Sequence, residues 1–540
     1  MIRPALVLPF LMLSPTPALA CGGFFCDGGP TPAPIDQAAE RIVFGVDPVA
    51  GEVTAHVQIA YVGEAHDFAW VVPVSAVPEL FLSNDALFNV VANATIPTFS
   101  LQNDTTGACD ISMPMAGGDR DDTDSADFDS ENGVTVVASQ VVGPYDTVVL
   151  KAENAELLVA WLQDQNYGVP DTLDAALAPY VAADQYFVAL RLQSDKSTGD
   201  LAPLGMTYKG SKASIPIQLT SIAAAPDMPL QVYVLGPSRA VPDNYLHVQI
   251  NQAAIDWYAG GTNYRQVVSR AADEAGGQSF ATDFTGPANT FAGSLWRPAM
   301  VDVASLRTTS DPLQWLNNVV FAVPASSQLT ALLTALVPPP SGIDAATFLS
   351  CPSCFEGQVS VADWDPDAAT SALQETILTP LAAAQGLIDR SSRITRLSSS
   401  MDAAEMTVDP VFVFNAEMPQ DLSNVHVAIN TTHCGFFEGF GDGERTLTLE
   451  DGREIKLPSV DFLARRGLTE ADYMADLASP AAIVIEDLGQ TGVGEVMFDY
   501  RDGADDEARN LGRGCDSSGT TGAGLVSVLG LLMIARRRRA

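Results

Sequence analysis

Alternation of apolar and polar residues is the clearest signal in this sequence, and it predicts β-strands along most of the chain. In residues 53–61, every second residue from Val53 to Tyr61 is apolar, as in a half-buried strand. Residues 66–74 follow after a Gly-Glu pair and are expected to form its antiparallel neighbour. Further strands are expected at 41–46, 134–142, 145–151, 185–193, 213–222, 230–236, 244–250, 405–414, 424–430, 482–486 and 495–500, with a hairpin at 445–457.

Apolar residues spaced three and four apart predict a smaller number of helices. Ser83 or Asn84 is expected to cap a helix that runs to Val91. Other helices are expected at 153–165, 172–182, 327–337, 366–389, 459–466 and 469–477. The sequence therefore predicts an α+β protein rich in antiparallel sheet, with two or more subdomains and short helices.

Length and composition indicate a folded protein with more than one core. The chain has 540 residues, of which 47% are hydrophobic and 17% charged, so it is not a disordered protein. A single core rarely grows beyond roughly 250–300 residues. The expected organisation is a signal peptide at 1–20, an α+β region at 21–340, a second α+β region at 341–500, an acidic linker at 501–514 and a sorting tail at 515–540.

The charge is strongly negative, which excludes some classes of partner. The chain has 28 basic and 66 acidic residues and a net charge of −38, so it repels phosphate backbones and we expect no nucleic-acid binding. Residues 117–132 hold seven of the acidic side chains. They do not form an EF-hand, because Asp124 stands where that loop needs glycine and Ser130 stands where it needs glutamate. We therefore expect a solvated loop there.

The N-terminus is typical of a secretory signal. Arg3 precedes an apolar run at 5–13, which is too short to span a bilayer. Ala18-Leu19-Ala20 is a small-x-small cleavage pattern, so signal peptidase is expected to cut after Ala20 and leave Cys21 first. Lipidation of Cys21 is the alternative, although a lipobox normally has leucine where Ala18 stands.

The C-terminus predicts attachment to the membrane. Residues 522–535 are apolar, but fourteen helical residues reach only about 21 Å across a hydrocarbon core of about 30 Å. Cys515, a Ser/Gly/Thr spacer, this short segment and the arginines at 536–539 together resemble the MYXO-CTERM sorting tail of myxobacterial surface proteins. That resemblance implies a sorting protease that cuts near Cys515, followed by attachment at the cell surface. The alternative is a retained, short transmembrane anchor.

Export places the cysteines in an oxidising compartment, where disulfides form. With Cys515 set aside, six candidates remain, an even number that allows fifteen connectivities. They are Cys21, Cys26, Cys109, Cys351, Cys354 and Cys434. Local bonds 21–26 and 351–354 would leave 109–434 as a long-range pair. The Cys351-Pro-Ser-Cys354 motif also suggests redox chemistry, but the residues after it are typical of a strand rather than of the helix that activates such a thiol.

No familiar catalytic motif occurs in the chain. There is no GxSxG, HExxH, P-loop or dinucleotide fingerprint, so we expect no catalytic residues, no metal site and no cofactor. His56, His247 and His426 lie within predicted strands and are interpreted as ordinary sheet residues. The adjacent His433 and Cys434 would point to opposite faces of a strand, which disfavours a thiol–imidazole pair.

Several motifs resemble the DUF2330 family of exported bacterial proteins. They are CGGFFC at 21–26, IDQAAERIVF at 35–44, DFAWVVPV at 67–74, VPEL at 77–80, RITRL at 393–397 and EMTVDPVF at 405–412. The resemblance covers most of the chain from 21 to about 430. It implies no activity and supplies no catalytic residues. From the residues themselves, the 67–74 motif reads as a strand buried on both sides, and Arg393 and Arg396 are candidates for ion pairs with carboxylates.

The leading hypothesis is an exported, surface-anchored protein of the Gram-negative envelope with a structural or binding role. Its expected partners are signal peptidase, the sorting protease and the membrane through the tail. The alternatives are a secreted hydrolase without a recognisable motif and a surface module that binds a divalent cation or a glycan.

Overall fold

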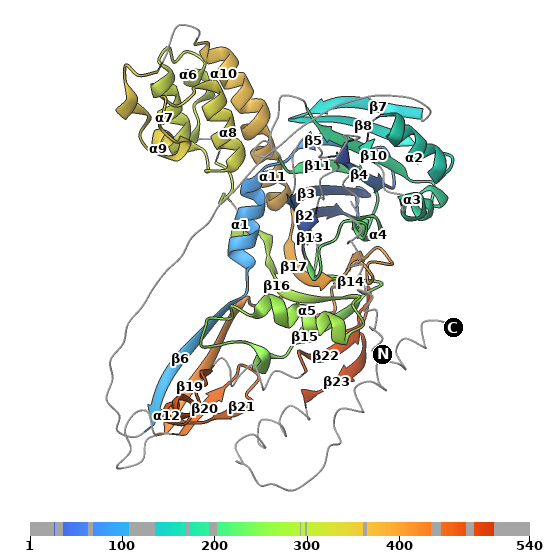
Figure 1. Cartoon of the computed structure of the whole chain (residues 1–540), viewed down its shortest axis with the longest axis vertical. Helices are drawn as coiled ribbons and strands as arrows, with labels where there is room; N and C mark the ends of the chain where they lie inside the picture. The colour runs from blue at the N-terminus through green and yellow to red at the C-terminus, as the bar shows by residue number, and fades with distance from the viewer. Residues whose placement is uncertain are drawn as a thin grey trace, which may run out of the picture.

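Three parts of the molecule are visible in the computed structural model (Figure 1): a central body of β-sheets, a helical lobe at one end and a long sheet at the other. The structure describes residues 36–62, 69–106, 135–165, 173–193, 202–291, 300–359, 364–433, 444–470 and 480–501, with the short stretches 26–27, 167–168 and 293–297. Mixed helices and mainly antiparallel sheets confirm the predicted α+β class. In the described residues, no helix is both long and apolar enough to cross a membrane, and 522–535 lies outside them.

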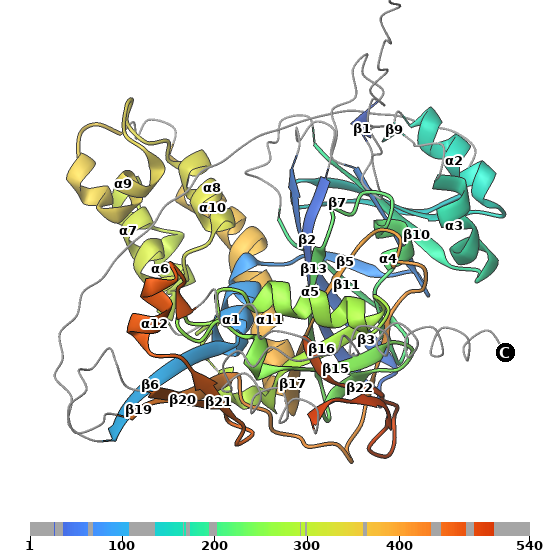
Figure 2. The ribbon, with the colours of Figure 1, turned by 60° about the horizontal axis from the view of Figure 1, so that its bottom comes forward.

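The body is built on a ten-stranded mixed sheet (Figures 1 and 2). Its strands lie in the order β23 (Glu495–Asp499), β22 (Ala482–Asp487), β15 (Leu246–Ile250), β16 (Ser279–Pro287), β17 (Arg393–Met401), β13 (Met228–Gly236), β2 (Asp36–Asp47), β3 (Glu52–Val62), β11 (Leu204–Lys209) and β5 (Glu79–Leu82). The pairs β15–β16 and β13–β2 are parallel, and the others are antiparallel. Seven of these strands come from 21–340, and β17, β22 and β23 come from 341–500, so one sheet contains strands of both expected regions.

Smaller sheets surround the large one. A four-stranded sheet has the order β4 (Ala69–Val74), β10 (Tyr186–Leu192), β8 (Tyr145–Lys151) and β7 (Thr135–Val142). A second has the order β21 (Glu454–Leu457), β20 (Glu444–Thr448), β19 (Val425–His433) and β6 (Thr98–Thr106). A three-stranded sheet comprises β12 (Ala213–Ser214), β18 (Val411–Phe414) and β14 (Ala240–Pro242), and β1 (Cys26–Asp27) pairs with β9 (Tyr167–Gly168).

Helices begin where the sequence offers caps. The side chain of Asn84 accepts the backbone N–H of Ala86 and starts α1 (Asp85–Thr95), as predicted. Asp311 caps α7 (Pro312–Ala322) and Ser326 caps α8 (Ser327–Leu336) in the same way. The other helices are α2 (Ala155–Asp164), α3 (Leu173–Ala182), α4 (Ile217–Thr220), α5 (Tyr264–Glu274), α6 (Val303–Leu306), α9 (Ala345–Ser350), α10 (Pro366–Leu373), α11 (Thr379–Arg390) and α12 (Val460–Arg465).

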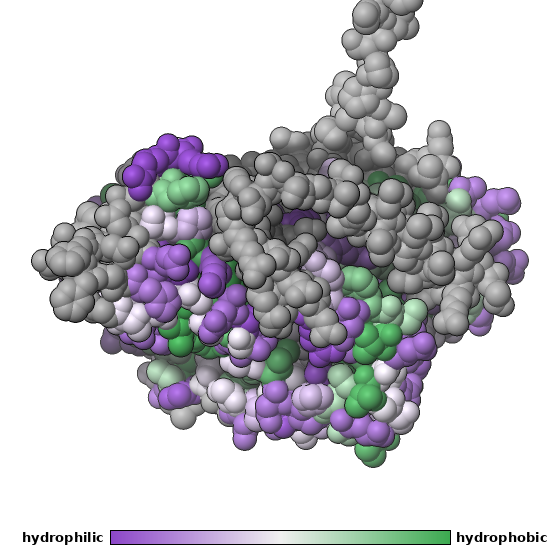
Figure 3. Space-filling view, turned by 90° about the horizontal axis from the view of Figure 1, so that it is seen from below, coloured by the Kyte–Doolittle hydropathy of each residue, from purple (hydrophilic) through white to green (hydrophobic). Residues whose placement is uncertain are grey.

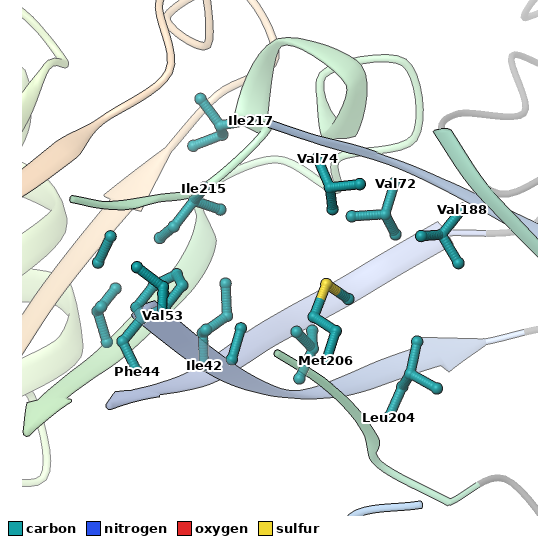
Figure 4. Close-up of a cluster of buried hydrophobic side chains, with 14 of the residues drawn as sticks. Ile42, Phe44, Val53, Val72, Val74, Val188, Leu204, Met206, Ile215 and Ile217 are labelled. Carbon is teal, nitrogen blue, oxygen red and sulfur yellow. The ribbon is translucent and has the colours of Figure 1, made fainter. Parts of the chain in front are cut away.

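The two faces of the ten-stranded sheet bury different cores. One face packs against β4 and β10, and Ile42, Phe44, Val72 and Val188 meet between the two sheets (Figure 4). The opposite face, which carries Val43, packs against α1, α11 and helices of the lobe. Alternation of side chains along each strand therefore supplies both cores at once. In β4, residues 70–72 are all buried, which confirms the prediction of a strand buried on both sides.

Three sequence predictions of strands are wrong, and each has a local cause. Residues 66–74 do not pair with 53–61: β4 pairs with β10, while β3 forms its hairpin with β2 across a turn that holds Gly51 at φ 60°. The predicted strand at 213–222 is interrupted by Pro216, after which α4 begins. The predicted strand at 405–414 is reduced to β18, which starts after Pro410.

The long helix expected at 366–389 is present but not uniform. It consists of α10, a π-helical turn at Gln374–Leu378 and α11, so the chain stays helical to Arg390. Helices α5 and α7 and strands β16 and β17 were not among the predicted elements. Seen from below, polar and apolar side chains are interspersed over the described surface (Figure 3).

Candidate functional site

A row of polar side chains crosses three neighbouring strands of the ten-stranded sheet. His247 on β15 and Glu486 on β22 are register partners, so their side chains lie on one face. Thr282 comes from β16, the strand on the other side of β15. The side chains of His247 and Glu486 are 4% and 7% exposed, and Thr282 is half-buried. The sheet thus joins residues that are far apart in the sequence.

These three residues form a chain of hydrogen bonds. His247 Nδ1 lies 2.8 Å from Glu486 Oε1, and His247 Nε2 lies 2.9 Å from Thr282 Oγ1. The amide of Gln249, which is two residues further along β15, donates to the same Glu486 oxygen over 3.1 Å. Both imidazole nitrogens are therefore engaged, one by a carboxylate and the other by a hydroxyl. We call Glu486, His247 and Thr282 the relay.

Arg239 adds a positive charge at the hydroxyl end of the relay. It precedes β14, and its Nη2 donates to Thr282 Oγ1 over 3.2 Å while its Nη1 donates to the carbonyl of Pro419 over 3.3 Å. The side chain of Gln420 accepts the backbone N–H of Arg239 over 2.8 Å. Within the described part of the chain, the buried Nε of Arg239 has no hydrogen-bond partner.

The environment fixes the protonation states of the relay. Burial lowers the pKa of His247 and outweighs the hydrogen bond and the charge of Glu486, which act in the opposite direction. Burial alone would raise the pKa of Glu486, but the hydrogen bond and charge of His247 and the charge of Arg239 contribute to a net lowering. At neutral pH the carboxylate is therefore ionised and the imidazole is neutral.

This combination determines the direction of each hydrogen bond. An ionised carboxylate can only accept, so Nδ1 of His247 must carry the ring proton. Nε2 is then the acceptor, and the hydroxyl of Thr282 donates to it. The Thr282 oxygen in turn accepts from Arg239, so every bond has one donor and one acceptor. Chemically, the arrangement places a hydroxyl group against a neutral imidazole base that a carboxylate orients.

A second buried network lies on the opposite face of the sheet and reads as structural. Asp283, at a bulge of β16, accepts from Arg396 Nε over 2.8 Å and from the hydroxyl of Tyr264 over 2.5 Å, and Ser398 also donates to it. The side chains of Asp283 and Arg396 are 0% and 3% exposed. The predicted ion pairing of Arg396 is confirmed, as is that of Arg393, which contacts Asp421 at 2.6 Å.

The other histidines have separate environments. His56 lies on β3, and its Nδ1 is 2.7 Å from Ser83 Oγ. Burial, with a smaller contribution from the charge of Arg390, lowers the pKa of His56 to about 3. His426 on β19 lies 2.9 Å from Glu450, and its ring stacks on Phe99.

His433 bridges two hydroxyl groups at the exposed end of β19. Its Nδ1 is 2.8 Å from Thr106 Oγ1, and its Nε2 is 3.1 Å from Thr446 Oγ1. His66 and Cys434 lie outside the described residues, so the relation of His433 to Cys434 stays a prediction.

One of the predicted disulfides is present. Cys351 and Cys354 are bonded, with an S–S distance of 1.99 Å and a Cα–Cα distance of 5.4 Å. Pro352–Phe355 forms a short 3₁₀ turn that includes Cys354, and residues 356–359, which were expected to be strand-like, form turns and a bend. Cys26 lies in β1, but its side chain is not described. The other predicted residues lie outside the described part of the chain: Ala20, Cys21, Cys109, the acidic stretch 117–132, Cys434 and Cys515. Among the described residues, no group of histidine, cysteine and carboxylate side chains is arranged to hold a metal ion.

Sequence reasoning did not single out the relay. It placed His247 in a strand but gave no role to Thr282, Glu486 or Arg239. His247 in the middle of the predicted strand 244–250 and Glu486 directly after the apolar run 482–485 were available signals. Thr282 could not be found, because the strand that carries it was not predicted.

Comparison with known proteins identifies a family only. A family model described as an uncharacterized protein conserved in bacteria (DUF2330) matches residues 15–288. The similar motifs noted at 393–397 and 405–412 fall outside that match. No curated protein and no solved structure matches the chain.

Proposed function

Because the chain belongs to the DUF2330 family, whose description names no activity, we propose a function from its own residues: an exported protein anchored in the outer membrane or at the cell surface, with a structural or binding role. The observation that carries this proposal is the pairing of a secretory signal at 1–20 with a sorting-type tail at 515–540. Each segment alone is common, but together they would direct one chain first to export and then to attachment at the surface.

Each end would be processed by a different enzyme. Signal peptidase would cut after Ala20, where two small residues flank Leu19. A sorting protease would cut near Cys515, in a spacer of small residues that gives it an unstructured segment to enter. The arginines at 536–539 would keep the end of the tail in the cytoplasm until the cut. The Cys515 thiol is the better nucleophile for attachment of a lipid than the serines beside it.

The folded body supports a structural or binding role. Its ion pairs tie together elements that are distant in the sequence, as Arg396 of β17 does with Asp283 of β16. The disulfide Cys351–Cys354 suits an oxidising compartment. A net charge of −38 favours solubility outside the cell.

Replacement of Cys515 tests the proposal. Cys515→Ala should leave an unprocessed form that still contains 536–539, and less protein should reach the surface. Ser518→Ala, three residues further along the same spacer, is the matched control and should be processed normally. The readouts are protease accessibility on intact cells and mass spectrometry of the C-terminal peptide.

Two results would contradict the proposal. If Cys515→Ala is processed and displayed like the wild type, Cys515 is not the attachment residue. If the wild-type protein stays in the cytoplasm with residues 1–20 intact, the protein is not exported.

A further inference from the structure

The relay has the parts of a nucleophilic site in the right order. A nucleophilic hydroxyl needs a base within hydrogen-bond reach, and the base needs a third group that fixes its tautomer. Thr282 Oγ1 lies 2.9 Å from Nε2 of His247, and Glu486 lies 2.8 Å from Nδ1 of the same ring. The three residues come from three adjacent strands, so the sheet holds them rigidly.

We propose that Thr282 is a nucleophile for acyl transfer from a carboxylic ester to water, with His247 as its base and Glu486 as the residue that positions His247. This activity goes beyond the envelope role proposed above and does not depend on it.

The reaction balances with the groups that are present. Thr282 Oγ would attack the ester carbonyl carbon while its proton passes to Nε2 of His247. The ester C–O bond would then break, and Nε2 would return the proton to the departing alcohol. Water would next attack the carbonyl carbon of the acyl-threonine and give a proton to the same nitrogen. The bond between that carbon and Thr282 Oγ would then break, Nε2 would return the proton to Thr282 Oγ, and the carboxylic acid would leave. No metal or redox partner enters any step.

Arg239 supplies a reason for an acyl group to bind beside Thr282. Its Nη2 already donates to the hydroxyl oxygen, while its buried Nε has no acceptor among the described residues. A buried donor without a partner destabilises the fold, because the hydrogen bond that it made to water is not replaced. The carbonyl oxygen of an ester would provide the missing acceptor, and this donor would stabilise the negative charge that develops on it.

The rival explanation is that the relay only compensates buried charge. Glu486 is negative and Arg239 is positive, and the imidazole and hydroxyl connect them through three hydrogen bonds. A purely structural relay would affect stability when it is changed, but it would never carry an acyl group. Covalent labelling therefore distinguishes the two explanations, whereas thermal unfolding alone does not.

The experiment uses the purified full chain and 4-nitrophenyl acetate as the probe. We expect saturable release of nitrophenol and an acetyl group on the peptide that contains Thr282. Thr282→Val and His247→Gln should lower kcat/KM by about 100-fold or more, the usual contribution of general-base catalysis. Thr282→Ser should keep the activity, because it restores the hydroxyl.

Matched controls exist in the same fold. Thr285→Val removes a buried hydroxyl from the same strand, one that lies 3.3 Å from Thr395. His426→Gln breaks a different histidine–glutamate pair. Both variants should keep wild-type turnover and acetylation.

Glu486→Gln tests the positioning role. A glutamine amide can donate to Nδ1, which would move the ring proton to Nε2 and block acceptance from Thr282. We expect kcat to fall with little change in KM. In the wild type, activity should persist below pH 6.5, because burial lowers the pKa of His247.

Absence of acetyl from Thr282, or equal turnover by Thr282→Val, would overturn the proposal. If Thr282→Val does not fold, Thr282→Ser and Glu486→Gln decide: loss of labelling in the serine variant, or unchanged kcat in the glutamine variant, overturns it equally.

Discussion

Mild acid should destabilise this protein through a histidine that is neutral in its core. Burial lowers the pKa of His56 to about 3, from the 6.5 that is usual for a histidine in water. Between these values the unfolded chain binds a proton at this ring that the folded chain does not bind. Stability therefore falls as the pH drops below 6.5, by about 1.4 kcal/mol for each pH unit. From pH 7 to pH 5 the contribution of His56 is about 2 kcal/mol.

His56→Gln isolates this contribution. Glutamine can still bond to Ser83, which lies 2.7 Å from Nδ1 of His56, but it does not titrate. The free energy of unfolding should be measured by urea denaturation of the full chain at pH 7 and pH 5. The loss between the two values should be smaller in His56→Gln than in the wild type by about 2 kcal/mol.

His433→Gln is the matched control, because folding does not bury this exposed side chain. It should lose nearly as much stability in acid as the wild type. If His56→Gln and the wild type lose the same amount between pH 7 and pH 5, His56 does not oppose folding in acid and the reasoning is refuted.

Other features of the structure give further expectations. Replacing Cys351 and Cys354 together by serine should lower the free energy of unfolding by about 2 kcal/mol, as expected for so short a loop, and an unchanged urea midpoint would contradict a structural role. Asp283→Ala should cost about 3–5 kcal/mol, because it leaves Arg396 buried without its carboxylate; a loss under 1 kcal/mol would mean that water replaces the partner. Deleting 117–132 should leave the melting temperature nearly unchanged, and stabilisation of the intact chain by calcium would reveal a metal site instead of a loop.

Local signals in the sequence were sufficient for much of the fold. Asn84 was recognised as a cap, and the alternation around Val53 identified β3, because both signals depend only on neighbouring residues. Strand pairing was not recoverable in the same way. β3 pairs with β11, whose residues lie about 150 positions away in the sequence. The spacing of apolar residues within either strand does not predict that contact. Proline explains another difference from the prediction. Pro216 interrupts the predicted strand at 213–222, because proline has no N–H to donate to a neighbouring strand.

The relay shows the same limit at the level of chemistry. Its members depend on β15 lying between β16 and β22, an order that a single sequence does not encode in any short motif. By contrast, the signal at 1–20 and the tail at 515–540 are predicted from contiguous residues, by composition and spacing, and both stay predictions.

The intact mass of the protein isolated from the surface of the producing bacterium tests the proposed function most directly. We predict a mature chain that begins at Cys21 and ends near Cys515, with any added mass located on Cys515. A chain that still contains residues 1–20 would contradict export, and one that keeps the arginines at 536–539 would contradict cleavage of the tail near Cys515.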